Sequence, residues 1–331
     1  MSEPSREIHV GNPALEADLR DRLEAVEEAL AEAVRTDTPT VSEAGDYLLR
    51  AGGKRFRPML LLLGSRFGNA EDPRLIAGAV ATELVHLATL YHDDVIDEAD
   101  VRRGIPSANV RWGNTVAILT GDFLFARASG IASELGAEVT RLLAATIAKV
   151  CEGQIREVEA SRRPETDEAT YMAVIERKTA SLISAACRLG GMLSEADPAV
   201  TDTLERYGHA LGLAFQLSDD VMDLVSDEAT LGKHPAADLK EGVQTLPVIV
   251  ALRESERREE LRTLLRAPAA DGLDRALEII RGDGALSRAR EAVTLEVRRA
   301  LREAERLPGG PARSALESLA AFLAERCGAA V

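Results

Sequence analysis

Two copies of the pattern Asp-Asp-x-x-Asp, at 93–97 and 219–223, are the residues best suited to chemistry. Aspartates four residues apart share one helical face, so each copy presents at least two carboxylates to one point. Because like charges repel, such a cluster persists best when a cation neutralises it. Oxygen-only ligands suit Mg²⁺, which proteins hold through one or two carboxylates plus substrate phosphates. These two acidic motifs therefore predict a cavity that binds a diphosphate through several Mg²⁺ ions. The candidate ligands are Asp93, Asp94, Asp97, Asp219, Asp220 and Asp223.

Both acidic motifs follow apolar residues at helical spacing, Leu84 and Leu87 before the first and Leu211 and Phe215 before the second. Each motif should therefore lie at the C-terminal end of a helix, where acids oppose the helix macrodipole and do not stabilise the fold. A solvated acidic patch is the structural alternative, and two copies in one context disfavour it. An EF-hand is disfavoured because no glycine lies in the middle of a loop.

Cationic residues form several groups around the acidic motifs, at 52–58, 102–103, 178 and 233. Arginine offers a fork for phosphate oxygens, lysine a point charge, and glycine a close approach of the backbone. Alone, such groups could be charge compensation or a lysine snorkelling from an apolar helix. Together with two acidic motifs they suffice for two diphosphates. No Ser-His-Asp order and no dinucleotide glycine loop is found. We therefore expect a reaction in which diphosphate leaves and electrostatics provide catalysis.

The composition of the chain disfavours some classes of protein. The chain has 331 residues, 46% of them hydrophobic, and a net charge of −15, which argues against nucleic acid or an anionic membrane surface as the main partner. Three widely spaced cysteines read as reduced thiols in a cytoplasmic protein. No apolar signal core and no run of 18 apolar residues appears, so we predict no membrane span.

Stretches without glycine or proline have the lengths of helices. They are 14–38, 79–103, 165–189, 213–231, 285–307 and 312–327. The first carries an amphipathic stripe of leucine and valine at spacings of three and four. No strand alternation is found. The prediction is one all-α domain over 14–331 with about ten or more helices, preceded by a mobile segment at 1–13.

The chain resembles the trans-isoprenyl diphosphate synthases, the polyprenyl synthetase family, from about residue 40 to residue 250. The ordered matches are Gly-Gly-Lys-Arg-Phe-Arg-Pro at 52–58, Glu-Leu-Val-His at 83–86, His-Asp-Asp-Val-Ile-Asp at 92–97, Arg-Arg-Gly at 102–104, Gly-Asp-Phe at 121–123, Gly-Gln at 153–154, Lys-Thr at 178–179, Phe-Gln-Leu-x-Asp-Asp-x-x-Asp at 215–223, Gly-Lys at 232–233 and Thr-Leu-Pro at 245–247. Two departures concern the segment 232–245. Ala236-Ala237-Asp238-Leu239 replaces Gly-x-Asp-Leu, and Val243-Gln244 replaces a frequent lysine.

The resemblance implies an all-α, isoprenoid-synthase-type bundle around a central cavity, as a homodimer. It implies head-to-tail condensation of an allylic diphosphate with isopentenyl diphosphate, with three Mg²⁺ ions per active site. The departing diphosphate would remove the proton, so no protein base is assigned. Release of an apolar product suggests peripheral contact with a membrane.

The same resemblance implies the role of each site residue. Asp93, Asp97 and Asp219 would hold Mg²⁺, and the other three aspartates would complete the metal shells, partly through water. Groups for the allylic diphosphate and the reaction centre are Arg102, Lys178, Thr179, Gln216 and Lys233. Groups for isopentenyl diphosphate are Gly53, Lys54, Arg57, His86 and Arg103.

Product length should depend on the helix before Asp93. Thr89, Ala88 and Val85 lie roughly 6, 7.5 and 12 Å back along its axis. In short-chain relatives a bulky aromatic four or five residues back blocks the tunnel, and here both residues are small. Tyr91 is two residues back and turns away from Asp93. We therefore predict a product longer than C20, from about C30 to about C45, a quinone side-chain precursor.

Three alternatives stay open. A short-chain synthase making C20 is the nearest. A class I terpene cyclase shares metal-assisted ionisation but would not need a second set of cations. A non-catalytic subunit of a two-component synthase should have lost motif aspartates, and both motifs are intact.

Overall fold

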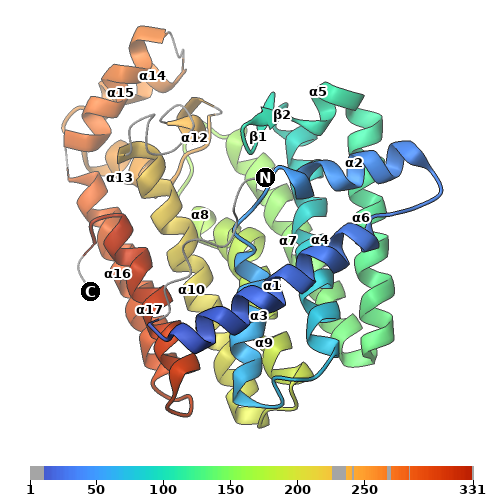
Figure 1. The fold of residues 1–331 in the computed structure, drawn as a ribbon. Helices are drawn as coiled ribbons and strands as arrows, with labels where there is room; N and C mark the ends of the chain where they lie inside the picture. Colours follow the sequence, from blue (N-terminus) through green and yellow to red (C-terminus); the bar gives the residue numbers. More distant parts are fainter. Residues whose placement is uncertain (1–10, 226–235, 241, 267–269, 283, 330–331) are drawn as a thin grey trace. The chain divides into compact units, whose positions relative to one another are not determined.

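In the computed structural model the chain is almost entirely helical (Figure 1). The structure describes residues 11–225, 236–240, 242–266, 270–282 and 284–329. Its helices are α1 (Pro13–Ala33), α2 (Pro39–Arg50), α3 (Phe56–Gly64), α4 (Arg74–Ile96), α5 (Ala108–Trp112), α6 (Asn114–Leu135), α7 (Ala137–Ser161), α8 (Glu168–Ile175), α9 (Ser181–Leu193), α10 (Pro198–Val225), α12 (Ala237–Lys240), α13 (Leu246–Glu254), α14 (Arg258–Arg266), α15 (Ala270–Gly282), α16 (Ala285–Ala304) and α17 (Pro311–Arg326). Short turns η1 (Ser65–Phe67) and η2 (Glu176–Ala180) interrupt them. The all-α prediction is confirmed.

The helices form two compact units. Unit 1 contains residues 1–147, 182–208 and 303–318, and unit 2 contains 148–181, 209–302 and 319–331. A single domain over 14–331 stays a prediction, and residues 1–10 of the N-terminal segment lie outside the described part of the chain.

Helix α1 shows how local sequence starts and stops an element. The Asn12 side chain accepts a hydrogen bond from the Leu15 backbone N–H at 3.0 Å, and Pro13 occupies the first turn. The predicted apolar stripe of α1 is buried. The helix ends at Ala33 and does not continue to residue 38. Thr38 precedes a proline and takes an extended conformation as the N-cap of α2.

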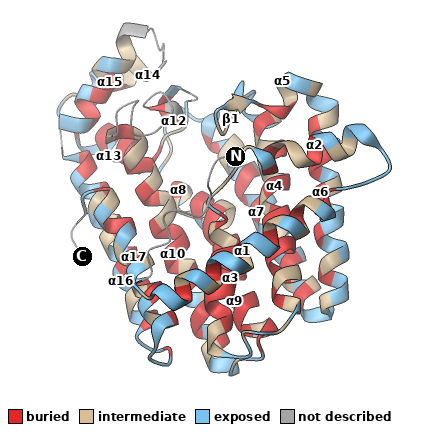
Figure 2. Ribbon diagram, in the orientation of Figure 1, coloured by how far each residue is buried: buried red, intermediate tan, exposed pale blue. Residues whose placement is uncertain are grey.

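Helix α4 is the buried centre of unit 1 and runs beside α6 (Figure 1). Both helices have the length and mean hydropathy of a membrane span, which is weak evidence because core helices meet the same test. In α4, 67% of the apolar window is buried, so its composition is explained by the core. Only 33% of the α6 window is buried, and Figure 2 shows exposed residues along much of α6.

The predicted helix over 79–103 is wrong beyond Ile96. The chain turns after α4 into an antiparallel pair, β1 (Val101–Arg102) with β2 (Ile105–Pro106). Arg103 and Gly104, between the strands, both have positive φ, at 53° and 77°. Positive φ at both central residues is the requirement of a tight two-residue hairpin. The two neighbouring arginines therefore lie on a hairpin, where the sequence suggested a helix.

In unit 2, the stretch 165–189 begins with α8 and then forms the π-helical turn η2. Such turns are rare and often mark functional sites. Lys178 and Thr179 lie on this turn, which the sequence did not predict.

Candidate active site

The first acidic motif ends α4 in unit 1, and its three aspartates differ in environment. Asp94 is fully buried, and Arg102 Nε donates to its Oδ1 at 2.6 Å. Burial raises the pKa of the Asp94 carboxyl, and the nearby Arg102 opposes this change. Asp93 is half-buried and Asp97 is exposed. In the first motif, Asp93 and Asp97 are therefore at least partly exposed, whereas Asp94 is buried and hydrogen-bonded to Arg102.

The second acidic motif, on α10 in unit 2, also has a buried middle aspartate. Asp220 accepts hydrogen bonds from the Tyr171 hydroxyl and from Gln216 Nε2, the latter at 2.8 Å. Burial raises the pKa of Asp220 to about 7, and repulsion from Asp219 and Asp223 acts in the same direction. Asp219 and Asp223 are half-buried.

The buried Asp220 predicts a pH-dependent stability. Its pKa is about 7 in the folded chain and 3.8 ordinarily, so between about pH 4 and pH 7 the folded chain retains a proton that the unfolded chain has lost. Stability from this group therefore falls as the pH rises through that window. Asp220→Asn stays neutral at every pH. We expect it to exceed the wild type by roughly 2–4 kcal/mol at pH 8 but by only roughly 1–2 kcal/mol at pH 5, where the wild type has lost only part of this stability.

Urea unfolding of the metal-free protein at the two pH values measures this difference. Asp219→Asn is the matched control, since it removes a half-buried charge from the same turn of α10. An equal effect of Asp220→Asn at pH 5 and pH 8 would contradict the assignment.

A hydrogen-bonded chain joins Asp220 to the π-helical turn. Thr179 Oγ1 donates to Gln216 Oε1 at 2.8 Å, and Gln216 in turn donates to Asp220. Lys178 Nζ donates to Glu157 of α7 at 2.5 Å. Three predicted residues of unit 2 are thereby brought together, and two further ones, Tyr171 and Glu157, were missed. No spacing pattern joins Tyr171 to a residue 49 positions away.

The cations of 52–58 have separate environments in unit 1. Arg55 is buried, has a left-handed backbone with φ of 45°, and forms ion pairs with Glu27 and Glu83. Arg55 therefore stabilises the fold through these ion pairs, and it is not one of the cations expected to bind isopentenyl diphosphate. Lys54 is exposed and Arg57 is half-buried.

Gly53 and Arg103 are in close contact. Gly53 has a φ of 152°, and a Cβ there would lie 3.1 Å from Arg103 Nη2. Arg103 Nη1 donates to the carbonyl oxygens of Leu48, at 2.8 Å, and of Gly52. The absence of a side chain at residue 53 thus gives the guanidinium its place against the backbone.

His86 lies among these cations. Burial holds the pKa of His86 well below its usual value, and Arg57, Arg103 and Arg55 lower it further. His86 is therefore neutral at physiological pH and can accept as well as donate a hydrogen bond. The neighbouring arginines supply positive charge suited to an anion.

The carboxylates fit a hard cation by their chemistry. They offer only oxygen, and Asp94 Oδ2 is buried without a hydrogen-bond partner among the described residues. Within that part of the chain no three His, Cys, Asp or Glu side chains are already arranged around one point as a metal site. Lys233 lies outside the described residues, as does the whole segment 226–235.

The predicted chain-length residues lie on α4. Val85 and Ala88 are fully buried and Thr89 is half-buried, with its hydroxyl donating to the His86 carbonyl at 2.7 Å. Tyr91 donates its hydroxyl to the Ala44 carbonyl of α2, so it points away from the motif as expected.

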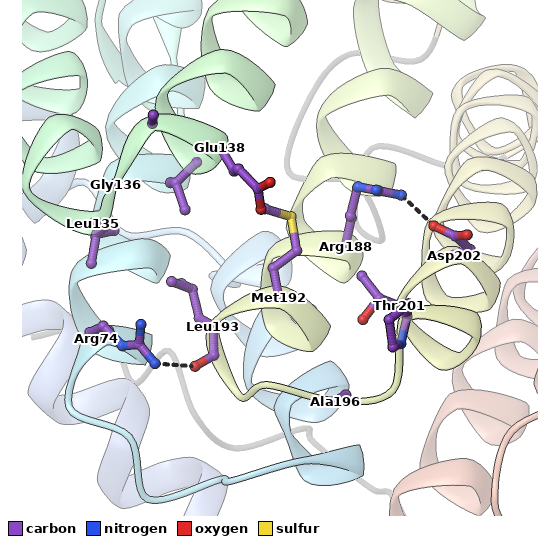
Figure 3. Close-up of a pocket in the computed structure, with 13 residues that line it drawn as sticks. Arg74, Leu135, Gly136, Glu138, Arg188, Met192, Leu193, Ala196, Thr201 and Asp202 are labelled. Carbon is purple, nitrogen blue, oxygen red and sulfur yellow. Dashed lines mark hydrogen bonds and ion pairs between the residues drawn. The ribbon is translucent and has the colours of Figure 1, made fainter.

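A cavity of about 390 Å³ lies elsewhere in unit 1 (Figure 3). Residues from the start of α4, the α6–α7 joint and the α9–α10 joint line it, including Arg74, Leu135, Met192 and Thr201. None of the predicted site residues is among them. Arg74 stands about 28 Å from Asp93 along the axis of α4, at 1.5 Å per residue.

Known proteins share this fold over nearly the whole chain. A nonaprenyl diphosphate synthase from Mycobacterium tuberculosis is 41% identical, with 97% of each chain covered. Component 2 of a heptaprenyl diphosphate synthase from Geobacillus stearothermophilus is 40% identical over 95% of this chain and 98% of its own. The crystal structure of a geranylgeranyl pyrophosphate synthase from Corynebacterium glutamicum, complexed with calcium and isoprenyl diphosphate, is 40% identical with a TM-score of 0.84, and the match covers 96% of this chain and 98% of that one.

An all-α isoprenoid synthase fold with two acidic motifs defines a class of enzymes that act on diphosphates. Residues 38–280 match the family described as Polyprenyl synthetase, and the chain belongs to that family. It is a prenyltransferase. The resemblance first found in the sequence motifs is confirmed.

Proposed function

We propose that this enzyme condenses an allylic diphosphate with isopentenyl diphosphate, head to tail, and makes an all-trans polyprenyl diphosphate of about C30 to about C45. The observation that carries the product length is the small pair Ala88 and Thr89 behind Asp93, where a bulky residue would block a growing chain. Nonaprenyl and heptaprenyl synthases at 41% and 40% identity support the same range, while a geranylgeranyl synthase at 40% identity keeps C20 as the alternative product.

The allylic diphosphate is proposed to bind at the acidic motifs. Asp93, Asp97 and Asp219 would hold Mg²⁺, three ions per site, with the remaining motif aspartates completing the shells. Mg²⁺ supplies charge neutralisation for the departing diphosphate. Arg102, Lys178 and Lys233 would contact the diphosphate oxygens. Thr179 and Gln216, which are hydrogen-bonded to each other, would line the reacting carbons.

Isopentenyl diphosphate is proposed to bind at the cations of unit 1. Lys54, Arg57 and Arg103 would bind its phosphate oxygens, and the neutral His86 would donate a hydrogen bond without adding charge. Gly53 would let the backbone approach. Binding to protein cations needs no metal, which distinguishes this substrate from the allylic one.

A second candidate function is that of one subunit in a two-component synthase, favoured by the relative named as component 2. The intact motifs favour an active chain. The test is consumption of labelled isopentenyl diphosphate by the purified chain alone with an allylic primer and Mg²⁺. Turnover that EDTA abolishes supports the proposal. Absence of turnover without an added partner protein would favour the two-component form.

We also propose that two copies associate through the exposed apolar part of α6. Ile118 and Leu119 are 42% and 60% exposed there. Sedimentation of the purified chain at micromolar concentration should give a homodimer. Leu119→Arg should weaken it by at least about a hundredfold, because a charge then enters an apolar interface.

Leu295→Arg on α16 is the control, since Leu295 is similarly exposed at 49% and lies outside α6. A dimer that persists in Leu119→Arg, or dissociates equally in both variants, would exclude this face. We further propose that the enzyme is cytoplasmic and that it contacts a membrane peripherally when it releases its apolar product.

A further inference from the structure

The last turn of α17 reaches the second acidic motif through Arg326. Arg326 Nη2 donates to Asp219 Oδ1 at 2.6 Å and to the Phe215 carbonyl at 3.2 Å. Its Nε donates to Ser218 Oγ at 2.8 Å. The guanidinium carbon lies 5.2 Å from the centroid of the Phe215 ring, a cation–π distance. The side chain is only 17% exposed, so this contact differs from a solvated surface ion pair.

The neighbouring contacts hold the guanidinium in one place. Ser218 Oγ donates to the Leu323 carbonyl at 2.9 Å, which ties α10 to the turn of α17 that precedes Arg326. Arg290 of α16 makes a separate bond at the same helix end, where its Nε donates to the Cys327 carbonyl at 2.7 Å; the groups that receive the Arg326 guanidinium are the Phe215 carbonyl and the Ser218 hydroxyl. The arginine is therefore anchored by backbone and hydroxyl groups that do not depend on Asp219. A rigid planar fork loses little entropy when it orients a carboxylate.

The positive charge of Arg326 offsets repulsion among the aspartates of the second acidic motif. Three aspartates lie within five residues of α10, and their mutual repulsion contributes to the raised pKa of Asp220. A permanent cation on Asp219 offsets part of that repulsion. It also selects one orientation of the carboxylate, because the charge-assisted hydrogen bond is short and directional. No sequence motif signals this, since Arg326 is 107 positions from Asp219.

We infer that Arg326 is a positioning residue for Asp219, and that the C-terminal turn of the chain thereby sets the affinity of the second motif for a magnesium–diphosphate complex. The inference rests on the proposed function of that motif. Arg326 acts through the carboxylate and is not itself a catalytic residue.

The test compares Arg326→Gln, Arg326→Lys and the control Arg290→Gln in the full chain. Calorimetric titration with inorganic diphosphate in the presence of Mg²⁺ measures affinity without turnover. Arg326→Gln should weaken binding about tenfold and raise the Mg²⁺ concentration for half-maximal activity by a similar factor. The KM for isopentenyl diphosphate should stay unchanged. Arg326→Lys should recover part of the affinity, since it keeps the charge and loses the fork.

Arg290→Gln removes an arginine-to-carbonyl bond at the same helix end and should bind diphosphate as the wild type does. Equal or tighter binding by Arg326→Gln would overturn the inference, as would an equal loss in Arg290→Gln. These outcomes require a wild type that binds magnesium–diphosphate and turns over. A wild type that does neither contradicts the proposed function itself, so the two failures are distinguishable.

Discussion

Alanine in place of Asp93 or Asp219 is expected to reduce turnover at least about a thousandfold while the helical fold is retained. Each substitution removes a carboxylate proposed to hold Mg²⁺ against the departing diphosphate. Both side chains are partly exposed and outside the apolar core, so their loss should cost little stability. Initial rates with an allylic primer and isopentenyl diphosphate, together with circular dichroism, measure the two properties.

Glu98→Gln is the matched control for the first motif. Glu98 is an exposed acid one position after Asp97, and glutamine keeps its size. This variant should retain wild-type turnover, which separates ligation from a general loss of negative charge. Near-normal turnover in Asp93→Ala or Asp219→Ala would remove that residue from the proposed metal site.

Phenylalanine in place of Ala88 is expected to shorten the product to C20 or less while leaving the first condensation intact. Ala88 is about 7.5 Å behind Asp93 along α4, so an aromatic ring there would meet the chain after a few additions. Product chromatography of the reaction with a radiolabelled primer measures the length. The rate of the first addition should change less than about threefold, since no diphosphate group is touched.

Two further variants keep this prediction testable. Ala88 has no exposed surface, and a larger side chain can destabilise a packed site by about 1–3 kcal/mol. Thr89→Phe places a ring at a half-buried position one residue on and should also shorten the product. Leu87→Phe, a fully buried position on another face of α4, should leave the length unchanged. Unaltered products from folded Ala88→Phe and Thr89→Phe would exclude both residues as length determinants.

The regular parts of the fold were predictable from periodicity. The stripe of α1 and the placement of each acidic motif at the end of an apolar helix follow from spacings of three and four. The hairpin after Ile96 could not be predicted, because the stretch to residue 103 lacks the glycine and proline that usually mark a turn. Its turn depends on Arg103, whose positive φ is unusual for an arginine.

Some residues of the candidate site can be predicted from the sequence, and others cannot. The aspartates and cations were found from residue type and order, since charge clusters are visible in the sequence. The hydrogen-bond partners of those residues could not be found in this way, because Tyr171, Glu157 and Arg326 reach them through tertiary packing. Gln154 is similar. Gln154 belongs to the Gly-Gln match at 153–154 but has no role that its residue type predicts, and its buried amide has no hydrogen-bond partner among the described residues.

The length of the product made by the purified chain is the most direct test of the proposed long-chain synthase activity. The chain alone is incubated with Mg²⁺, a C15 allylic diphosphate and excess isopentenyl diphosphate, and the hydrolysed products are resolved by liquid chromatography and mass spectrometry. All-trans products from about C30 to about C45 are expected. Products that stop at C20, or recovery of the C15 primer alone, would contradict the proposed activity.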